Sequence, residues 1–246
     1  MTRLEAWPLP GLPEIRPGDD LAALLATAAG DVLRGDDVLV VAHKIVSKAE
    51  GAIASLADVV ASDRARELAA GTDKDPRHVQ VVLDQSAELV RAERGVLISR
   101  THHGFVCANA GVDASNAPAP DTLVCLPRDP DASARGLRAA LPGRPAVVIA
   151  DSFGRAWRNG QVEVAIGVAG LRPLEDWRGR TDSVGRELRA TWIAVADEAA
   201  AAADLVRDKD SREPAVVVRG LARHVTDDDG PGAVALLRPR AEDLFG

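Results

Sequence analysis

The 246-residue sequence lacks the features that mark several classes of protein. Its two cysteines, Cys107 and Cys125, are too few for a disulfide framework or a four-thiolate metal site. No apolar run approaches the roughly 18 residues that a membrane-spanning helix needs, and the N-terminus has no signal-peptide core. A net charge of −7 leaves no basic excess to neutralise nucleic-acid phosphates. We therefore expect a soluble cytoplasmic protein with no membrane and no nucleic-acid partner.

Three common motifs of nucleotide-binding and catalytic sites are also missing. The sequence has no G-x-x-x-x-G-K-[ST] phosphate loop, which would be the Walker motif, and no G-x-G-x-x-G fingerprint of a Rossmann fold. It has no G-x-S-x-G elbow of a serine hydrolase either. If the protein binds a nucleotide, the cradle must be of another kind.

Short apolar runs supply the fold prediction. Aromatic residues make up 3% of the chain and hydrophobic residues 46%, so Ala, Val and Leu must fill the core. Apolar runs predict strands at residues 37–42, 95–99, 105–108, 146–150, 162–168 and 215–218. Residues 86–91 suit either a helix or a strand. The elements follow no strict βαβ order, so we predict a mixed α/β (α+β) fold.

Apolar spacing and proline content indicate the helices and the organisation of the chain. Periods of three and four predict helices at residues 21–33, 57–70 and 184–207, the last with Leu188 and Trp192 on its apolar stripe. Its alanine run suits close packing, either within the chain or across an interface. The proline-rich stretch at residues 116–120 reads as a connection between two lobes of one domain spanning residues 1–246.

Four polar clusters follow apolar runs, where ligand sites of α/β proteins usually lie. In the first, Lys44 and Lys48 are four residues apart with Ser47 between them, which suits a phosphate as well as it suits a solvated basic turn. In the second, Asp113 and Asn116 offer the hard oxygen donors that Mg²⁺ or Mn²⁺ prefers, although such residues also form turns. His102, His103 and Cys107 in the same cluster allow a zinc interpretation.

The other two clusters lie in the second half of the chain. Asp151 and Ser152 follow a predicted strand directly, and Arg155 and Arg158 come next, which suits a corner for metal and phosphate; the alternative is a helix cap with solvated arginines. Residues 176–187 favour helix capping and surface ion pairs. Together the acids, lysines and arginines indicate a site for a metal-bound polyphosphate, because phosphoryl transfer chiefly requires neutralisation of charge.

Several strings in these clusters carry a family resemblance. VLVVAHKIVSKAEG, GVLISRTHHGFVCANAGVDASN and DSFGRAWRNGQVEVAIGVAG resemble coenzyme F-420-0:L-glutamate ligases, also called F-420 gamma-glutamyl ligases, and the match extends over nearly the whole chain. The resemblance is to the ligase domain of actinobacterial members, without a separate C-terminal reductase domain. It implies a two-lobed ligase fold that uses GTP with Mg²⁺ or Mn²⁺, and K⁺ as a further cation. The acceptor carboxylate would be activated as an acyl phosphate that L-glutamate attacks, further gamma-linked glutamates would follow, and the enzyme would be a homodimer.

The resemblance also assigns roles to residues of this sequence. It implies GTP contacts at Leu12, Pro13, Glu14, Ile15, His43, Lys44, Lys48 and Asn116. It implies metal ligands at Asp113, Asp151 and Ser152. Lys48 would stabilise charge on the transferred group, and His43 or His102 would take the proton of the amine. A further nucleotide contact is expected near residues 219–221.

Two other functions compete with this interpretation. One is a non-catalytic relative that binds a nucleotide or a deazaflavin without turnover. The other is a metal-dependent hydrolase that holds zinc through His102, His103 and Asp113 and needs no nucleotide. His43 stands where relatives often carry a small hydroxyl or amide residue, so its contact could be made by the backbone alone.

Overall fold

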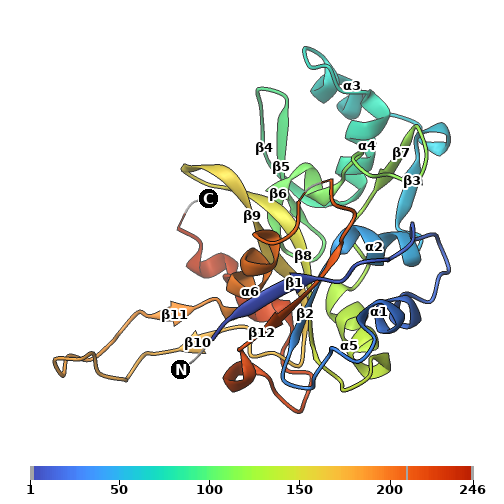
Figure 1. The fold of residues 1–246 in the computed structure, drawn as a ribbon. Coiled ribbons are helices and arrows are strands. Elements are labelled where there is room, and N and C mark those ends of the chain that lie inside the picture. The colour runs from blue at the N-terminus through green and yellow to red at the C-terminus, as the bar shows by residue number, and fades with distance from the viewer. Residues whose placement is uncertain (1–2, 209, 245–246) are drawn as a thin grey trace.

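A five-stranded sheet forms the centre of the fold (Figure 1). The structure is a computed structural model that describes residues 3–208 and 210–244. The strands, in spatial order, are β1 (Glu5–Pro8), β12 (Ala215–Arg219), β2 (Val38–Ala42), β8 (Ala146–Arg155) and β9 (Arg158–Ala169). β2 and β8 run parallel, and the other neighbours pair antiparallel.

Helices cover both faces of this sheet, which explains its continuous apolar strands. Along β2, Leu39 and Val41 belong to the core on one face, whereas Val38 and Val40 belong to the core on the other. The first face packs against α1 (Leu21–Ala29), α2 (His43–Ala49) and α5 (Pro130–Ala140). The second packs against α6 (Val195–Asp204), whose buried alanines allow close approach to the strands. The alanine face of α6 is thus used within the chain.

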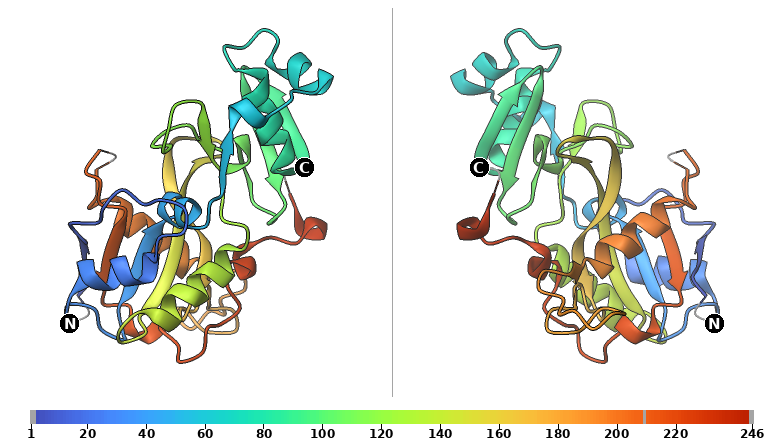
Figure 2. Two further views of the ribbon diagram at one scale, coloured as in Figure 1. Left: turned by 90° about the vertical axis from the view of Figure 1, so that its right-hand side faces the viewer. Right: turned by 90° about the vertical axis from the view of Figure 1, so that its left-hand side faces the viewer.

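Residues 53–125 form a separate region with its own core, beyond one end of the central sheet (Figure 2). Its strands are β3 (Ile53–Ser55), β7 (Thr122–Val124), β4 (Ser86–Glu93), β5 (Val96–Thr101) and β6 (Val106–Ala108). They form a two-stranded and a three-stranded sheet. Helices α3 (Asp63–Ala69) and α4 (Pro76–Asp84) pack beside them, and short 3₁₀ turns include η1 (Leu56–Asp58) and η2 (Asn109–Gly111).

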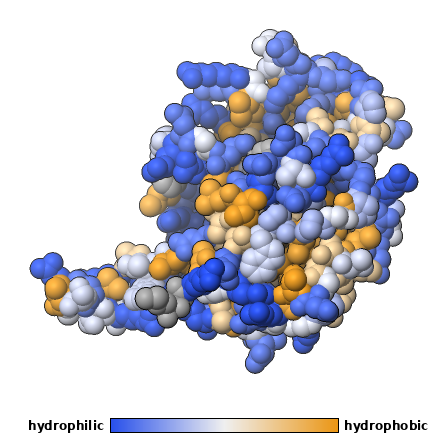
Figure 3. Space-filling view, in the orientation of Figure 1, coloured by the Kyte–Doolittle hydropathy of each residue, from blue (hydrophilic) through white to orange (hydrophobic). Residues whose placement is uncertain are grey.

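A long hairpin replaces much of the predicted helix at residues 184–207. β10 (Glu175–Asp176) pairs antiparallel with β11 (Trp192–Ile193), and the arm between them stands clear of the body of the molecule (Figures 1 and 3). Trp192 lies in β11 with the guanidinium of Arg178 4.1 Å from its ring centroid, so it takes no part in a helix. The prediction is therefore wrong before Val195, where α6 begins.

Some of the other secondary-structure predictions are confirmed, and others are wrong in extent. The mixed α/β fold and the predicted strands are confirmed, and residues 86–91 prove to be extended. β8 does not end at Ala150 but continues to Arg155, because it keeps pairing with β9. The first helix stops at Ala29, where Gly30 turns with φ = 52°, and the helix predicted at residues 57–70 is a 3₁₀ turn followed by the shorter α3. Among the described residues, no helix is long and apolar enough to cross a membrane.

Candidate functional site

The parallel pair β2 and β8 places two polar residues side by side at the carboxyl end of the sheet. Ala42 and Ala150 are register partners, so His43 and Asp151 follow them at the same level. The Nε2 atom of His43 lies 3.2 Å from Oδ1 of Asp151. His43 is buried, and its Nδ1 lies 3.3 Å from the hydroxyl of Ser47. Ligands of open α/β sheets usually bind at this end of parallel strands.

The next residue of α2 reaches a carboxylate from the other region of the chain. Lys44 Nζ lies 2.6 Å from Oδ2 of Asp113 and 2.6 Å from the hydroxyl of Ser115, and it also donates to the Ser115 carbonyl at 3.2 Å. Burial opposes ionisation of Asp113, but the hydrogen bonds from Lys44 and Ser115 outweigh it, so the pKa of this carboxyl lies below its usual value. Neighbouring residues of one helix thus contact both Asp113 and Asp151.

One turn further along α2, Lys48 points to the N-terminal segment. Its Nζ lies 2.5 Å from Oε1 of Glu14, and its side chain is 6% exposed against 66% for Glu14. The basic segment is therefore a helix that faces the interior, and the solvated-turn alternative is wrong. Of the other N-terminal residues, Ile15 is buried in the core and Leu12 packs against it, so only their backbones or the exposed Pro13 are open to a ligand.

Ser152 hydrogen-bonds to a carboxylate that the sequence interpretation missed. Its hydroxyl donates to Oε1 of Glu163, its register partner on β9, at 2.6 Å. The other oxygen of Glu163 lies 2.9 Å from Arg207, and Glu163 is buried. Because Asp151 and Ser152 lie within β8, the helix-cap alternative is also wrong. A lone acid in the apolar run at residues 162–168 was the signal that could have identified Glu163.

The oxygen donors of this site suit a divalent cation. Around the Lys44 ammonium, the carboxylate of Asp113 and two oxygens of Ser115 already converge on one positive charge. Carboxylate and hydroxyl oxygens are the ligands of Mg²⁺ and Mn²⁺, and Mg²⁺ commonly takes one or two carboxylates with substrate phosphates completing its shell. Within the described residues, no three His, Cys, Asp or Glu side chains form a metal-holding group. The protein thus offers part of a coordination shell, which a polyphosphate could complete.

Several candidate residues lie apart from this group. His102 Nε2 lies 3.0 Å from the carbonyl of Asp84, and His103 Nε2 lies 2.9 Å from that of Pro127, so each ring faces a different backbone segment. With no three-ligand group among the described side chains, the geometry does not supply the zinc set. Asn116 is exposed with φ = 55°, three residues beyond Asp113. Arg155 donates to the carbonyl of Asn159 at the exposed end of the β8–β9 hairpin.

The segment at residues 219–221 lies at the opposite end of the sheet. β12 runs antiparallel to β2, so Arg219 lies beyond Val38 and pairs with Asp37 at 2.7 Å. The start of β12 is the end near α2, where the carbonyl of Pro214 accepts a hydrogen bond from Ala42. Residues 219–221 therefore lie apart from the cluster around α2, whereas the residue just before Ala215 lies next to the start of α2.

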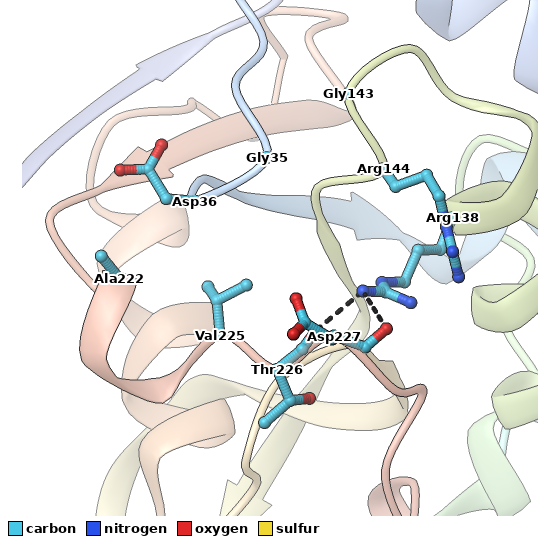
Figure 4. Close-up of a pocket in the computed structure, with 9 residues that line it drawn as sticks. All are labelled: Gly35, Asp36, Arg138, Gly143, Arg144, Ala222, Val225, Thr226 and Asp227. Carbon is cyan, nitrogen blue, oxygen red and sulfur yellow. Dashed lines mark hydrogen bonds between the residues drawn. The ribbon is translucent and has the colours of Figure 1, made fainter.

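A pocket of about 430 Å³ also lies at that opposite end (Figure 4). Arg138 lines it, but its guanidinium already bonds to Asp229 at 2.7 Å and to the carbonyls of Thr226 and Asp227 at 2.8 and 3.2 Å. Gly170 packs so closely that a Cβ there would lie 2.1 Å from Nε of Arg138. The guanidinium of Arg138 therefore joins loops of the fold and already has hydrogen-bond partners. For this reason we take the cluster around α2, and not this pocket, as the candidate site.

Comparison with known proteins agrees with the resemblance found in the sequence. A family model described as F420-0:Gamma-glutamyl ligase matches residues 11–220. A protein of Methanothermobacter thermautotrophicus named coenzyme F420:L-glutamate ligase is 46% identical, with 96% of each chain covered. Proteins of the same name are 46% identical in Methanopyrus kandleri, covering 98% of this chain and 97% of the relative, and 47% identical in Natronomonas pharaonis, covering 98% and 94%.

Proposed function

This chain belongs to the F420-0:gamma-glutamyl ligase family, and from that premise we propose that it is a GTP-dependent ligase that joins L-glutamate to coenzyme F-420-0. Further gamma-linked glutamates would be added in the same way. The acceptor carboxylate takes the γ-phosphoryl group of GTP, and the resulting acyl phosphate reacts with the glutamate amine. The products are an amide, GDP and phosphate.

The convergence of three distant segments on one helix carries this proposal. Residues 43 and 44 contact Asp151 and Asp113, and Lys48 contacts Glu14 on the N-terminal segment. Asp113 and Asp151, from separate parts of the chain, together with the two lysines of α2 suit a nucleotide tail whose negative charge is shared between cationic side chains and a metal ion. Phosphoryl transfer draws most of its rate from such positioning and charge neutralisation.

In the proposed reaction the side chains have distinct tasks. Residues 12–15 with His43, Lys44, Lys48 and Asn116 bind GTP, and Lys48 neutralises charge as the γ-phosphoryl group leaves GDP. The amine must lose a proton before its nitrogen attacks the acyl carbon and phosphate departs. His43 is better placed than His102 to accept it, because it lies against Asp151, whereas His102 faces a backbone carbonyl outside the cluster.

Asp113, Asp151 and Ser152 are the residues that would hold Mg²⁺ or Mn²⁺, with K⁺ as a further cation. When bound, a divalent ion would supply Lewis-acid stabilisation to phosphate oxygens. Ser152 is held by Glu163, which fixes the direction of its hydroxyl oxygen. The hydrogen bonds that Asp113 accepts hold its pKa below its usual value, so its carboxylate stays negatively charged, as a cation ligand must be.

One assay tests the proposal directly. The purified full chain is incubated with GTP, Mn²⁺, L-glutamate and F-420-0, and mass spectrometry counts the glutamyl units added. We expect glutamylated product and one GDP for each bond, with no product when glutamate or F-420-0 is omitted and no sustained GDP formation when F-420-0 is omitted. Binding of GTP or of the deazaflavin without any product would instead identify a non-catalytic relative. Product formation without nucleotide would contradict GTP dependence.

We also propose that the enzyme is a homodimer. The β10–β11 arm supports this, since its Val184 and Trp192 side chains are 73% and 51% exposed. Light scattering coupled to size-exclusion chromatography should give twice the mass of 25.8 kDa. A mass of one chain at micromolar concentration would contradict the dimer.

A further inference from the structure

Lys74 is a half-buried cation without an acidic partner. Its Nζ donates to Oδ1 of Asn109 at 2.7 Å, and within residues 3–208 and 210–244 no carboxylate oxygen lies within 4.0 Å of it. Burial lowers the pKa of Lys74 below its usual value, since water is removed and no anion replaces it. A cation in this state gains stability when an anion binds.

Two acids of this part of the chain are already paired with other cations. Asp75 is held by Arg77 through contacts of 2.6 to 3.2 Å, and Asp113 is held by Lys44. His78, one turn further, has a buried Nε2 without a hydrogen-bond partner, and burial lowers the pKa of its ring. His78 also interacts electrostatically with both Lys74 and Asp113, so this group lies beside the candidate site. Neither Asp75 nor Asp113 is thus an ion-pair partner of Lys74.

The loop that carries Asn109 is built to hold its side chain in place. Asn109 and Ala110 both adopt left-handed backbone angles, with φ of 53° and 52°, and Gly111 follows with φ = 72°. Non-glycine residues rarely adopt this conformation, and it persists where surrounding packing enforces it. Ala110 is 1% exposed, and Gly111 packs so closely on Leu126 that a Cβ would lie 2.6 Å away. The same loop continues to Asp113, so Lys74, from the connection between α3 and α4, and Lys44, from α2, contact it from two different segments.

The choice of lysine at this place is itself unusual for the chain. Only four of the 30 basic Lys and Arg residues are lysines, at positions 44, 48, 74 and 209. Position 209 lies outside the described residues, and Lys44 and Lys48 belong to the candidate site. Arginine serves most other basic positions. A lysine ammonium is a compact charge with three donors that can turn toward a small anion.

We propose that Lys74, with the side-chain amide of Asn109, binds a carboxylate of one of the two substrates that the enzyme joins, L-glutamate or the acceptor. This inference rests on the proposed function, because it takes the substrates from it. Lys74 donates to the carboxylate through the ammonium hydrogens not used by Asn109, and the amide nitrogen of Asn109 provides a second donor. The contact positions the substrate beside Asp113 and takes no part in the bond changes.

Steady-state kinetics on three variants of the full chain test the proposal. Lys74→Met removes the charge, Lys74→Arg keeps it, and Arg66→Met removes a charge from the exposed Arg66–Asp63 pair of α3 in the same region. We expect Lys74→Met to raise the KM of glutamate or of the acceptor by about 10- to 100-fold, the loss typical of a charge-assisted hydrogen bond. The KM of GTP should change by less than about twofold, Lys74→Arg should recover part of the loss, and Arg66→Met should resemble the parent.

The pattern of KM changes either identifies which substrate supplies the carboxylate or contradicts the proposed site. A rise confined to glutamate assigns the contact to the incoming amino acid, and a rise confined to F-420-0 assigns it to the acceptor. Unchanged KM values for both, an equal rise for GTP, or an equal effect of Arg66→Met would overturn the proposal.

Calorimetric binding of L-glutamate and of F-420-0, measured without turnover, separates this inference from the proposed function. Weaker binding to Lys74→Met than to the parent supports the carboxylate site even if the parent forms no product. If the parent is active and Lys74→Met binds both substrates as tightly as the parent does, the proposed carboxylate site is wrong and the ligase function still stands.

Discussion

The two ends of the central sheet both carry buried or half-buried charges, but they use them differently. At the end where β2 begins, Asp37 is 0% exposed and accepts two hydrogen bonds of 2.7 Å from Arg219. At the end where β2 leads into α2, Lys44 and Lys48 contact carboxylates whose side chains are 44% and 66% exposed. One end buries the acid inside a bidentate pair, whereas at the other end the acids that pair with Lys44 and Lys48 stay accessible to solvent.

This difference separates charges that stabilise the fold from charges available to a ligand. A buried bidentate pair is fully satisfied, and removing one partner leaves an uncompensated charge. A pair whose acid is exposed is worth little to stability, so a cation or phosphate can replace either partner at small cost. Variants at the two ends should therefore show opposite signatures, loss of stability at one and loss of turnover at the other.

Asp151→Asn should have the largest effect and should act on turnover alone. The amide keeps the shape of the side chain but cannot neutralise a cation, so GDP formation should fall by about 1,000-fold or more. The melting temperature should stay within about 3 °C of the parent, because Asp151 makes no bidentate pair. GDP release and calorimetry measure the two quantities, with Asp63→Asn on the exposed surface of α3 as the matched control. Normal turnover of Asp151→Asn at ordinary Mg²⁺ would remove this residue from the metal site.

Asp37→Asn should have the opposite effect, reducing stability and leaving turnover nearly unchanged. Breaking the buried pair with Arg219 should lower the free energy of unfolding by about 3 kcal/mol, which corresponds to a fall of about 6 to 12 °C in melting temperature for a chain of this size. The turnover number of the protein that stays folded at 25 °C should remain within about twofold of the parent. Urea unfolding measures stability and the GTP assay measures turnover. Lost turnover with unchanged stability would contradict the idea that charges at this end of the sheet serve stability rather than catalysis.

Local sequence patterns identified most of the central sheet and less of what surrounds it. The apolar runs at residues 37–42 and 215–218 were sufficient, because strands buried on both faces leave a continuous signal. The stripe through Leu188 and Trp192 had helical spacing, but hairpin pairing and stacking of Arg178 on Trp192 determine that structure. α2 was missed because its two lysines and serine resemble a polar turn, although its core contacts are made by Ile45 and Val46.

The candidate site was predictable only where residue types alone signal chemistry. Asp113 and Asp151 could be singled out as hard donors, but Lys44 reaches Asp113 across 69 residues, a contact that no local spacing reveals. The pairing of Ser152 with Glu163 depends on the register of β8 and β9. Lys74 had no local signal at all, since the absence of an acidic partner is visible only in the folded chain, within its described residues.

Lys48→Gln should have an intermediate effect on turnover. Its ammonium is nearly buried on α2 and would lie against the transferred phosphoryl group, so kcat should fall by about 100-fold, with a smaller change in the KM of GTP. Stability should hardly change, because the partner of Lys48 is an exposed glutamate. Single-turnover GDP formation measures the chemical step, and Arg66→Gln serves as a control for loss of a positive charge. A KM effect with unchanged kcat would assign Lys48 to ground-state binding of GTP alone.

The smallest expected effect concerns His224, which follows β12 at the end of the sheet where β2 begins. Its ring is buried, and its Nε2 accepts a hydrogen bond from Nε of Arg223 at 2.8 Å, which requires that nitrogen to be unprotonated. Burial, reinforced by the charge of Arg223 and opposed by Glu175, lowers the pKa of His224 below the value of 6.5 that it has when unfolded. The unfolded chain therefore binds the proton more readily, so the stability contributed by the neutral ring is present above pH 6.5 and decreases as the pH falls below it.

His224→Gln should make the fall of melting temperature between pH 7 and pH 5.5 shallower than in the parent, whereas His102→Gln, whose ring is exposed, should follow the parent curve. Turnover at pH 7 should be the same in all three proteins, because His224 lies at the far end of the sheet from α2. An unchanged slope in His224→Gln would show that acid sensitivity arises elsewhere. A change in turnover would show that the charges at the two ends of the sheet are coupled, which their separate pairing argues against.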